Sequence, residues 1–173
     1  AEAPVAPTLE FKLPDHAKLL QDVSSKNWPC RKAIEHLKSR NMPINDLYLG
    51  CTEYKCDCRY RMRIVIPYYD KKGKLIYYNG RAILDSKCKY LGPPKDSGVG
   101  KGDVIYMPKW PKPGSRLYLC EGEFNAKSLE LAGLNGGAAG GKTITPKQAI
   151  LLKDYDITIC LDNDNAGKQG IAK

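Results

Sequence analysis

The sequence predicts a mixed fold, in which an α+β part built around a basic β-hairpin precedes an α/β unit with a parallel sheet. Strand-like and helix-like segments alternate after residue 114, and this alternation is typical of parallel pairing. Before that point, two β-rich runs flank the Gly-containing turn Asp70–Lys74, which indicates an antiparallel hairpin. The segment 108–115, PKWPKPGS, contains three Pro and one Gly, and it marks the boundary between the two parts.

The first part is expected to begin with an extended segment and two helices. Residues 1–14 contain three Pro and no apolar period, so they are interpreted as a lead-in or linker. A short helix is predicted at 15–25, with Asp15 as its N-cap. A second helix is predicted at 28–41, because Pro29 suits a first turn and apolar residues recur at helical spacing behind it.

The predicted hairpin pairs residues 60–69 with residues 75–84, and its basic side chains are expected to share one face of the sheet. Residues 92–102 have the composition of a loop, and a further short strand is predicted at 103–107. The basic residues assigned to the face are Arg59, Arg61 and Arg63 on the first strand and Arg81 on the second.

The second part contains two apolar segments that are predicted to be parallel strands, 116–120 and 156–161. The second of these is almost continuously apolar, as expected of a strand buried on both faces. The region 134–142 is Gly-rich and is interpreted as a turn region, which leaves room for a short strand. Helices are predicted at 123–133, at 145–154 and from Asn165 onward.

The composition favours a globular protein with a polyanionic partner. Of the 173 residues, 42% are hydrophobic and 27% are charged, and 28 Lys and Arg against 19 Asp and Glu give a net charge of +9. Such a charge favours nucleic acid, although a solvated basic surface without a ligand is the alternative. No apolar run of about 18 residues exists and the start of the chain has no secretory pattern, so neither a membrane span nor secretion is expected.

The cysteines are interpreted as reduced thiols of a cytoplasmic protein. There are seven of them, an odd number. Cys51, Cys56 and Cys58 follow the spacing C-x4-C-x-C, whereas structural zinc usually takes two Cys pairs or a Cys pair with a His pair. No nearby His completes a set of four ligands. We therefore expect ordinary loop thiols here and no zinc.

Acidic residues follow both predicted parallel strands directly. Asp162 and Asp164 lie two positions apart after the second strand, so their carboxylates can converge on one ion. Glu121 follows the first strand, and neighbouring parallel strands would bring all three carboxylates to one sheet edge. Carboxylate oxygens suit Mg²⁺, which predicts a phosphoryl-transfer site. A surface turn with helix capping is the alternative for the Asp pair, and a first-turn Glu favoured by the helix dipole is the alternative for Glu123.

Three motifs occur in the order that one known family shows: CEGEFNA at 120–126, NGGAAGG at 135–141 and CLDNDNAGKQG at 160–170. Together they resemble the Toprim domain, which primases, topoisomerases and some nucleases share. The resemblance implies a Toprim-type parallel-sheet unit with Glu121, Asp162 and Asp164 as its catalytic and metal-binding residues, with Mg²⁺ or Mn²⁺ as cofactor.

Upstream, the segments RIVIPYYDKKGKLIYYNGRAI at 63–83 and KCKYLGPP at 87–94 resemble the basic N-terminal subdomain of DnaG-type and phage primase cores. The resemblance covers about residues 28–173 and implies a basic subdomain at 15–113 followed by a Toprim domain at 114–173. The family fold continues past the second acidic motif, so a fragment with a C-terminally truncated Toprim domain is expected. The residues expected to bind nucleic acid or nucleotide are Arg61, Arg63, Arg81, Lys87 and Lys89.

The resemblance implies a DNA primase that synthesises short RNA primers on a single-stranded DNA template from ribonucleoside triphosphates. A replicative helicase would be its partner, in the same chain or another, in the cytoplasm of a bacterial or phage-infected cell or in an organelle. One departure bears on activity: Asn125 stands where family members usually have Asp, and its amide brings a carbonyl oxygen without charge.

Two other classes of function remain open from the residues. One is a Toprim nuclease or topoisomerase-like enzyme, which would cut DNA rather than make RNA. The other is a nucleic-acid-binding remnant of a Toprim protein without catalysis. The upstream segments favour the primase, because their resemblance to the primase-core subdomain would be a coincidence in a nuclease or topoisomerase.

Overall fold

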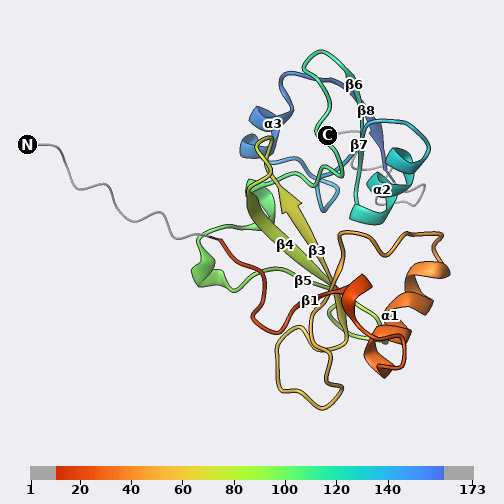
Figure 1. Ribbon diagram of the computed structural model, residues 1–173. Coiled ribbons are helices and arrows are strands. Elements are labelled where there is room, and N and C mark those ends of the chain that lie inside the picture. Colours follow the sequence, from red (N-terminus) through yellow and green to blue (C-terminus); the bar gives the residue numbers. More distant parts are fainter. Residues whose placement is uncertain (1–10, 162–173) are drawn as a thin grey trace, which may run out of the picture.

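The structure, a computed structural model, describes residues 11–161 and contains an antiparallel and a parallel sheet (Figure 1). In the first sheet the strands lie in chain order, and each pairs antiparallel with its neighbour. This sheet confirms the α+β character expected of the first part. The strands are β1 (Lys18–Leu19), β2 (Tyr48–Leu49), β3 (Arg63–Tyr69), β4 (Leu75–Ala82) and β5 (Tyr90–Leu91).

The predicted hairpin is confirmed as β3 and β4, and the local sequence explains its turn. The side chain of Asp70 accepts hydrogen bonds from the backbone N–H groups of Lys72 and Lys74, at 2.8 and 2.9 Å. Gly73 adopts a φ of 79°, a conformation that glycine reaches without steric cost. The chain therefore reverses tightly between two strands of β-forming residues.

The register gives the hairpin two different faces, because residues directly opposite each other in an antiparallel pair point to the same side. Arg81 is opposite Ile64, whereas Arg63 is opposite Ala82. The expected single basic face is therefore wrong: Arg63 and Arg81 lie on opposite faces, and Arg59 and Arg61 precede the strand. We call the face with Ile64, Ile66, Tyr68, Tyr77, Asn79 and Arg81 the inner face, and that with Arg63, Val65, Pro67, Tyr78, Gly80 and Ala82 the outer face.

One of the two helices predicted near the start of the chain exists. Helix α1 (Trp28–Lys38) has Asn27 as its N-cap, which accepts a hydrogen bond from the backbone N–H of Cys30, and Pro29 lies in its first turn. The helix predicted at 15–25 is wrong. That stretch forms β1 and a 3₁₀ turn, because pairing with β2 and a hydrogen bond from Leu20 N–H to the Leu47 carbonyl hold it extended.

The second sheet is parallel, as predicted, and has the order β7-β6-β8. Helix α2 follows β6, and helix α3 begins at a capping box formed by Thr145 and Gln148. The strand predicted at 103–107 is reduced to a 3₁₀ turn and one bridge, between Tyr106 and Ala138. The elements are β6 (Arg116–Cys120), α2 (Glu123–Leu131), β7 (Gly136–Ala138), α3 (Pro146–Leu152) and β8 (Asp156–Cys160).

The parallel sheet differs from the sequence-based prediction in the presence of β7 and in the exposure of β8. Strand β7 lies within the region expected to be a Gly-rich turn, and Gly136 allows it to pack closely on α2, since a Cβ atom there would lie 2.2 Å from the Ala126 carbonyl oxygen. Strand β8 is not buried on both faces as predicted, because it is an edge strand of the described sheet and Ile159 is half-exposed. The predicted helix from Asn165 onward lies outside the described residues.

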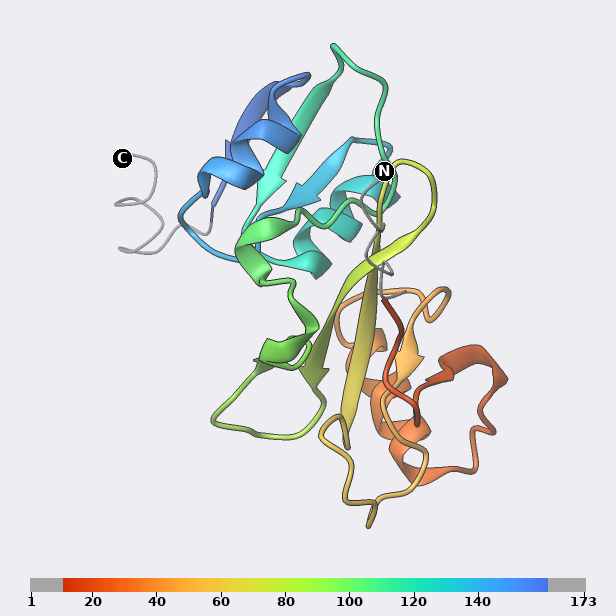
Figure 2. The ribbon, with the colours of Figure 1, turned by 90° about the vertical axis from the view of Figure 1, so that its left-hand side faces the viewer.

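The two sheets are joined through a shared core. Figure 2 shows the hairpin extending from the lower unit to the parallel sheet above it. One hydrophobic cluster contains Tyr68 of the inner face together with Tyr106, Phe124 of α2 and Ala138 of β7. A second cluster, including Leu117, lies within the parallel unit. The inner face therefore packs directly against the end of the parallel sheet where function was predicted. No helix in the described part of the chain is long and apolar enough to span a bilayer.

Candidate active site

Glu121 follows β6 at its carboxyl end, where ligands bind in open parallel sheets. Strand β8 runs parallel beside β6, with Cys120 opposite Cys160, so the residues that follow both strands start from the same edge. This pairing confirms the side-by-side arrangement on which the acidic cluster was predicted. Asp162 and Asp164 themselves lie outside the described residues, and their part in the site stays a prediction.

A cavity of about 300 Å³ opens beside Glu121, and its walls come from both sheets. The parallel unit supplies Glu121, Glu123 and Asn125, which carry oxygen donors. The polar and basic side chains come from the inner face of the hairpin, from β5, from the residues after α1 and from the 3₁₀ turn Lys101–Asp103. They are Asn79, Arg81, Tyr90, Arg40 and Lys101.

Glu123 is the most enclosed carboxylate of this cavity, with 2% of its surface exposed. Its Oε1 atom accepts hydrogen bonds from the Tyr68 hydroxyl at 2.5 Å and from the Asn79 amide at 2.6 Å. Both donors project from the inner face, whereas Glu123 begins α2. The sequence suggested only a helix-dipole role, but the structure shows a buried link between the two sheets.

This link and its surroundings change the acidity of the neighbouring tyrosines. Burial, followed by the charge of Glu123 and its hydrogen bond, raises the pKa of Tyr68 well above its ordinary value. Burial and the same carboxylate also raise the pKa of Tyr77 to about 12. Both phenols therefore stay protonated at neutral pH, and that of Tyr68 donates its hydrogen bond to the carboxylate.

Cationic groups approach the acidic residues from several elements. The guanidinium of Arg81 lies over the ring of Tyr90, 4.9 Å from its centroid, and that of Arg40 lies over the ring of Phe124, at 5.6 Å. The ammonium of Lys142 lies 3.9 Å from a carboxylate oxygen of Glu121, whose side chain is 17% exposed. The cavity thus combines carboxylates with cations, a combination suited to phosphate groups and their counterions.

The other predicted basic residues do not line this cavity. Arg63 is 9% exposed, and its guanidinium donates to the carbonyl oxygens of Gly80, Cys88 and Lys89 at 3.0, 2.9 and 3.4 Å. Burial lowers the pKa of this arginine. Arg63 therefore fastens the loop that carries the exposed Lys87 and Lys89.

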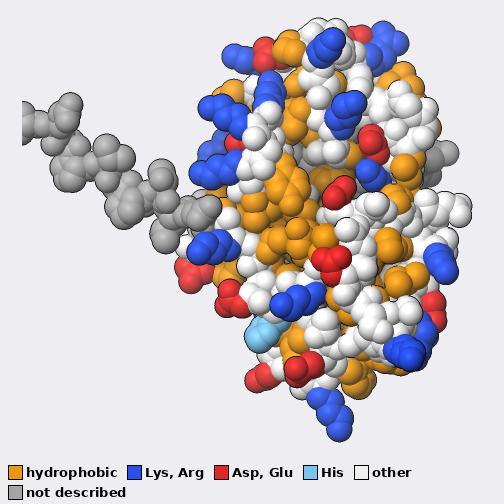
Figure 3. Space-filling model, in the orientation of Figure 1, with side chains coloured by type: hydrophobic (Ala, Val, Ile, Leu, Met, Phe, Trp, Pro, Cys, Tyr) orange, Lys and Arg blue, Asp and Glu red, His pale blue; other side chains and the backbone are white. Residues whose placement is uncertain are grey.

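Arg61 is exposed and lines a separate cavity together with Arg63, on the side of the outer face. Lys and Arg side chains are also spread over both units on the face shown in Figure 3. Nucleic-acid binding by Arg61, Arg63, Lys87 and Lys89 stays a prediction.

Sequence reasoning assigned no site role to four polar or basic residues of the cavity wall: Arg40, Asn79, Tyr90 and Lys101. Asn79 could have been found from its alternation with Arg81 on the same strand, once the hairpin register was known. Arg40 follows α1 and Lys101 lies in a 3₁₀ turn, far from the motifs in sequence. No local signal in the sequence identifies either residue.

Comparison with known families assigns both parts of the chain. Residues 27–109 match the family model described as the DNA primase catalytic core, N-terminal domain. Residues 118–173 match the family model described as Toprim-like. The second match includes Glu121 and extends over Asp162 and Asp164.

Individual proteins give the same result. A DNA primase of Clostridium acetobutylicum is 36% identical over 168 residues, which cover 92% of this chain and 26% of that protein. The solved structure of the DnaG catalytic core aligns with a TM-score of 0.66 and 20% identity, over 89% of this chain and 61% of that one. A DnaG primase catalytic domain bound to single-stranded DNA aligns with a TM-score of 0.66 and 20% identity. The alignment covers 86% of this chain and 59% of that one.

The fold and the cavity define a Toprim-type unit joined to a primase-core subdomain. The chain belongs to the family of Toprim-containing, DnaG-type DNA primases. It spans about a quarter of the length of the Clostridium relative.

Proposed function

We propose that this chain forms part of the catalytic core of a primase, which joins ribonucleotides into short RNA primers on single-stranded DNA by Mg²⁺-dependent nucleotidyl transfer. The observation that carries the proposal is the cavity beside Glu121, where carboxylates of the parallel unit meet Arg40, Arg81 and Lys101. The family membership and the likeness to a DnaG domain bound to single-stranded DNA support it.

The donor chemistry of the cavity fits a hard divalent cation. Glu121 and Asn125 offer a carboxylate and an amide oxygen, and oxygen ligands are those that Mg²⁺ and Mn²⁺ prefer. Glu121, with Asp162 and Asp164, would hold the ion. A bound ion would neutralise the triphosphate and lower the barrier to attack on the α-phosphate.

The remaining residues of the site would position the reactants. In primer synthesis a 3′-hydroxyl attacks the α-phosphate of a ribonucleoside triphosphate, and pyrophosphate leaves. Arg81, Arg40 and Lys101 would bind phosphate oxygens, because these cationic residues line the same cavity as Glu121. Glu123 would act as a positioning residue, since Tyr68 and Asn79 already occupy its Oε1 atom.

A primer assay of the intact protein tests the proposal. Single-stranded DNA, the four ribonucleoside triphosphates and Mg²⁺ are expected to give short, template-dependent RNA. The Asp162→Asn variant is expected to lose this product while it keeps its affinity for DNA. Nicked DNA without RNA would show that the protein is a nuclease and would contradict the proposal. Salt-sensitive DNA binding with neither product would show a non-catalytic protein.

A helicase in the same or another chain would be the partner of this activity. The family membership supports this proposal, because primers are needed where a duplex is opened for replication. Co-purification of primer synthesis with nucleotide-driven strand separation in the intact protein would support the partnership in the same chain.

A further inference from the structure

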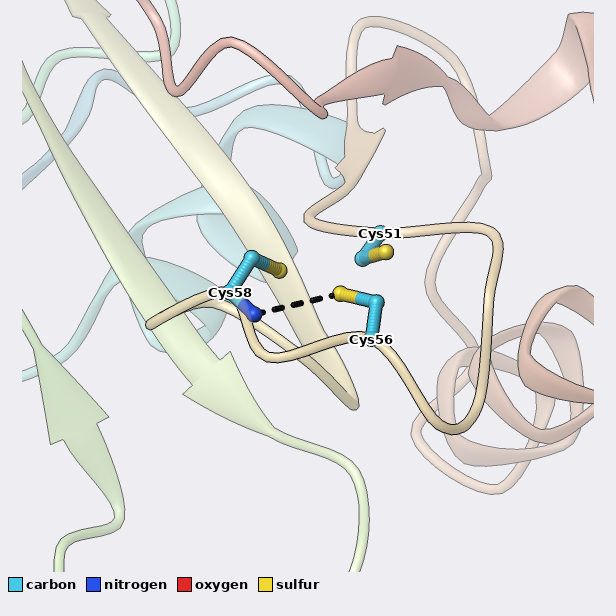
Figure 4. Close-up of side chains that lie close together, drawn as sticks. All are labelled: Cys51, Cys56 and Cys58. Atoms are coloured by element: carbon cyan, nitrogen blue, oxygen red, sulfur yellow. Dashed lines mark hydrogen bonds between the residues drawn. The ribbon is translucent and has the colours of Figure 1, made fainter.

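Three cysteines gather in the loop between β2 and β3, far from the carboxylate cavity. The ligand atoms of Cys51, Cys56 and Cys58 all lie within 4.8 Å of one another. Figure 4 shows the three side chains close together, with the sulfur atoms of Cys56 and Cys58 directed toward one another and that of Cys51 beside them. The spacing of these residues in the sequence did not predict a site, because it lacks the two Cys pairs of most zinc sites.

The loop is held closed at its ends, which explains how cysteines on both sides of a turn meet. The backbone N–H of Gly50 donates to the Arg63 carbonyl at 2.9 Å. Tyr60 packs so tightly against Gly50 that a Cβ atom there would lie 2.2 Å from the Tyr60 carbonyl oxygen. Cys51 at the start of the loop is consequently brought back to Cys58 near its end.

Helix α1 fixes the other side of the loop. The Asn27 amide donates to the Thr52 carbonyl at 2.7 Å. The ring of Trp28 meets that of Tyr54 edge-on, with 4.7 Å between the ring centroids. The segment between Leu49 and Arg63 otherwise contains no helix or strand, so its shape depends on such cross-links.

Backbone N–H groups are directed at two of the sulfur atoms. The Cys51 sulfur accepts from Glu53 N–H at 3.4 Å, and the Cys56 sulfur accepts from Cys58 N–H at 3.3 Å. These two hydrogen bonds hold the sulfur atoms of Cys51 and Cys56 in fixed positions within the loop.

We propose that Cys51, Cys56 and Cys58 bind one thiophilic ion, of which Zn²⁺ is the type, through three thiolates and one water. Three converging sulfur ligands select soft or borderline ions over Mg²⁺. Within residues 11–161 no fourth His, Cys, Asp or Glu ligand atom joins the group. Cys56 and Cys58 line a cavity of about 370 Å³ that is open to solvent, which leaves room for the water.

The ion would brace the arginine-bearing end of the loop. Arg59 follows Cys58 directly, Arg61 lies two residues further on, and both line the same cavity. An ion shared by Cys58 and Cys51 would therefore restrict the backbone positions of these two cationic residues. The role is structural and does not depend on the primer synthesis proposed above.

Spectroscopy with Co²⁺ as a probe tests the site in the intact, reduced and metal-stripped protein under anaerobic conditions. The proposal predicts thiolate-to-cobalt charge-transfer and tetrahedral d–d absorption that saturate at one ion per chain and disappear when Zn²⁺ is added. The Cys56→Ser variant is expected to lose the bands, and Cys88→Ser, which removes an exposed cysteine, is expected to keep them. Octahedral spectra, or bands unchanged in Cys56→Ser, would overturn the proposal.

Alkylation of the unmutated protein provides a test that does not rely on a variant's folding. With Zn²⁺ bound, peptide mapping is expected to show the partly exposed Cys56 and Cys58 protected from iodoacetamide, while Cys88 reacts as before. A chelator is expected to restore the reaction of Cys56 and Cys58. Equal reaction of these two cysteines with and without Zn²⁺ would refute the metal site.

Discussion

The two faces of the β3–β4 hairpin use the same residue type for different purposes. On the outer face, Arg63 is buried and its guanidinium is bound by three backbone carbonyl oxygens. On the inner face, Arg81 lines the cavity that contains Glu121 and Glu123. The face of the strand on which an arginine lies, rather than its charge alone, therefore decides whether it supports a loop or faces the candidate active site.

The largest effect is expected from the buried carboxylate that the inner face binds. Glu123→Ala leaves the Tyr68 hydroxyl and the Asn79 amide buried without their acceptor. We expect the free energy of unfolding to fall by about 3 kcal/mol, measured by urea denaturation. Glu35→Ala, which removes an exposed carboxylate on α1, is the matched control and is expected to change little. An unchanged stability of Glu123→Ala would show that the two sheets are not joined through this residue.

A smaller loss is expected on the outer face. Arg63→Ala removes the donors to Gly80, Cys88 and Lys89, and we expect it to lower the free energy of unfolding by about 2 kcal/mol. Arg63→Lys keeps the charge but cannot supply the forked donors, so it is expected to restore only part of the stability. Full restoration by lysine would mean that charge, and not hydrogen-bond geometry, makes this position important.

The inner face should also make the protein sensitive to alkali. The folded-state pKa of Tyr68 is raised above its unfolded value of about 10, so the unfolded chain releases this proton first as the pH rises. The stability linked to Tyr68 is thus fully present below about pH 10 and falls above it, by about 1.4 kcal/mol per pH unit. Denaturation curves at several pH values measure this slope. Tyr68→Phe is expected to reduce it, and an equal slope in that variant would contradict the assignment.

The smallest effect is expected for Arg81, and it concerns binding rather than stability. Arg81→Ala should weaken the affinity for single-stranded DNA at all sequences and reduce the slope of log K against log salt by about 0.7. Arg31→Ala, an exposed arginine on α1, serves as the control. Fluorescence anisotropy at several salt concentrations measures both. A loss of stability without a change in the salt slope would show that Arg81, like Arg63, supports the fold and does not bind DNA.

Segments with their own local signals were predicted well from the sequence. The hairpin has Asp70 and Gly73 in its turn, and α3 has Thr145 at its cap, so each is defined by residues a few positions apart. The position of Glu121 at a strand end was predictable for the same reason, because an apolar run and a glycine mark the boundary.

The failures concern features that depend on distant contacts. Residues 15–25 have an apolar pattern that fits a helix, but pairing of β1 with β2 outweighs it. The opposite orientation of Arg63 and Arg81 follows from the irregularity between Tyr68 and Tyr69, which shifts the hairpin register by one residue and which the alternation of residues along the strands does not show. The three cysteines meet in a loop whose shape depends on distant contacts, among them those of Gly50 with Tyr60 and of Asn27 with Thr52.

We propose that the cavity at the end of β6 is the catalytic centre of a primase. The rate of template-dependent RNA synthesis by a Glu121→Gln variant of the intact protein, measured beside its affinity for single-stranded DNA, tests this proposal. We predict a loss of rate of about 100-fold or more with nearly unchanged affinity, because a charge that serves the transition state is removed from an otherwise intact site. Primer synthesis at the unmutated rate would contradict the claim.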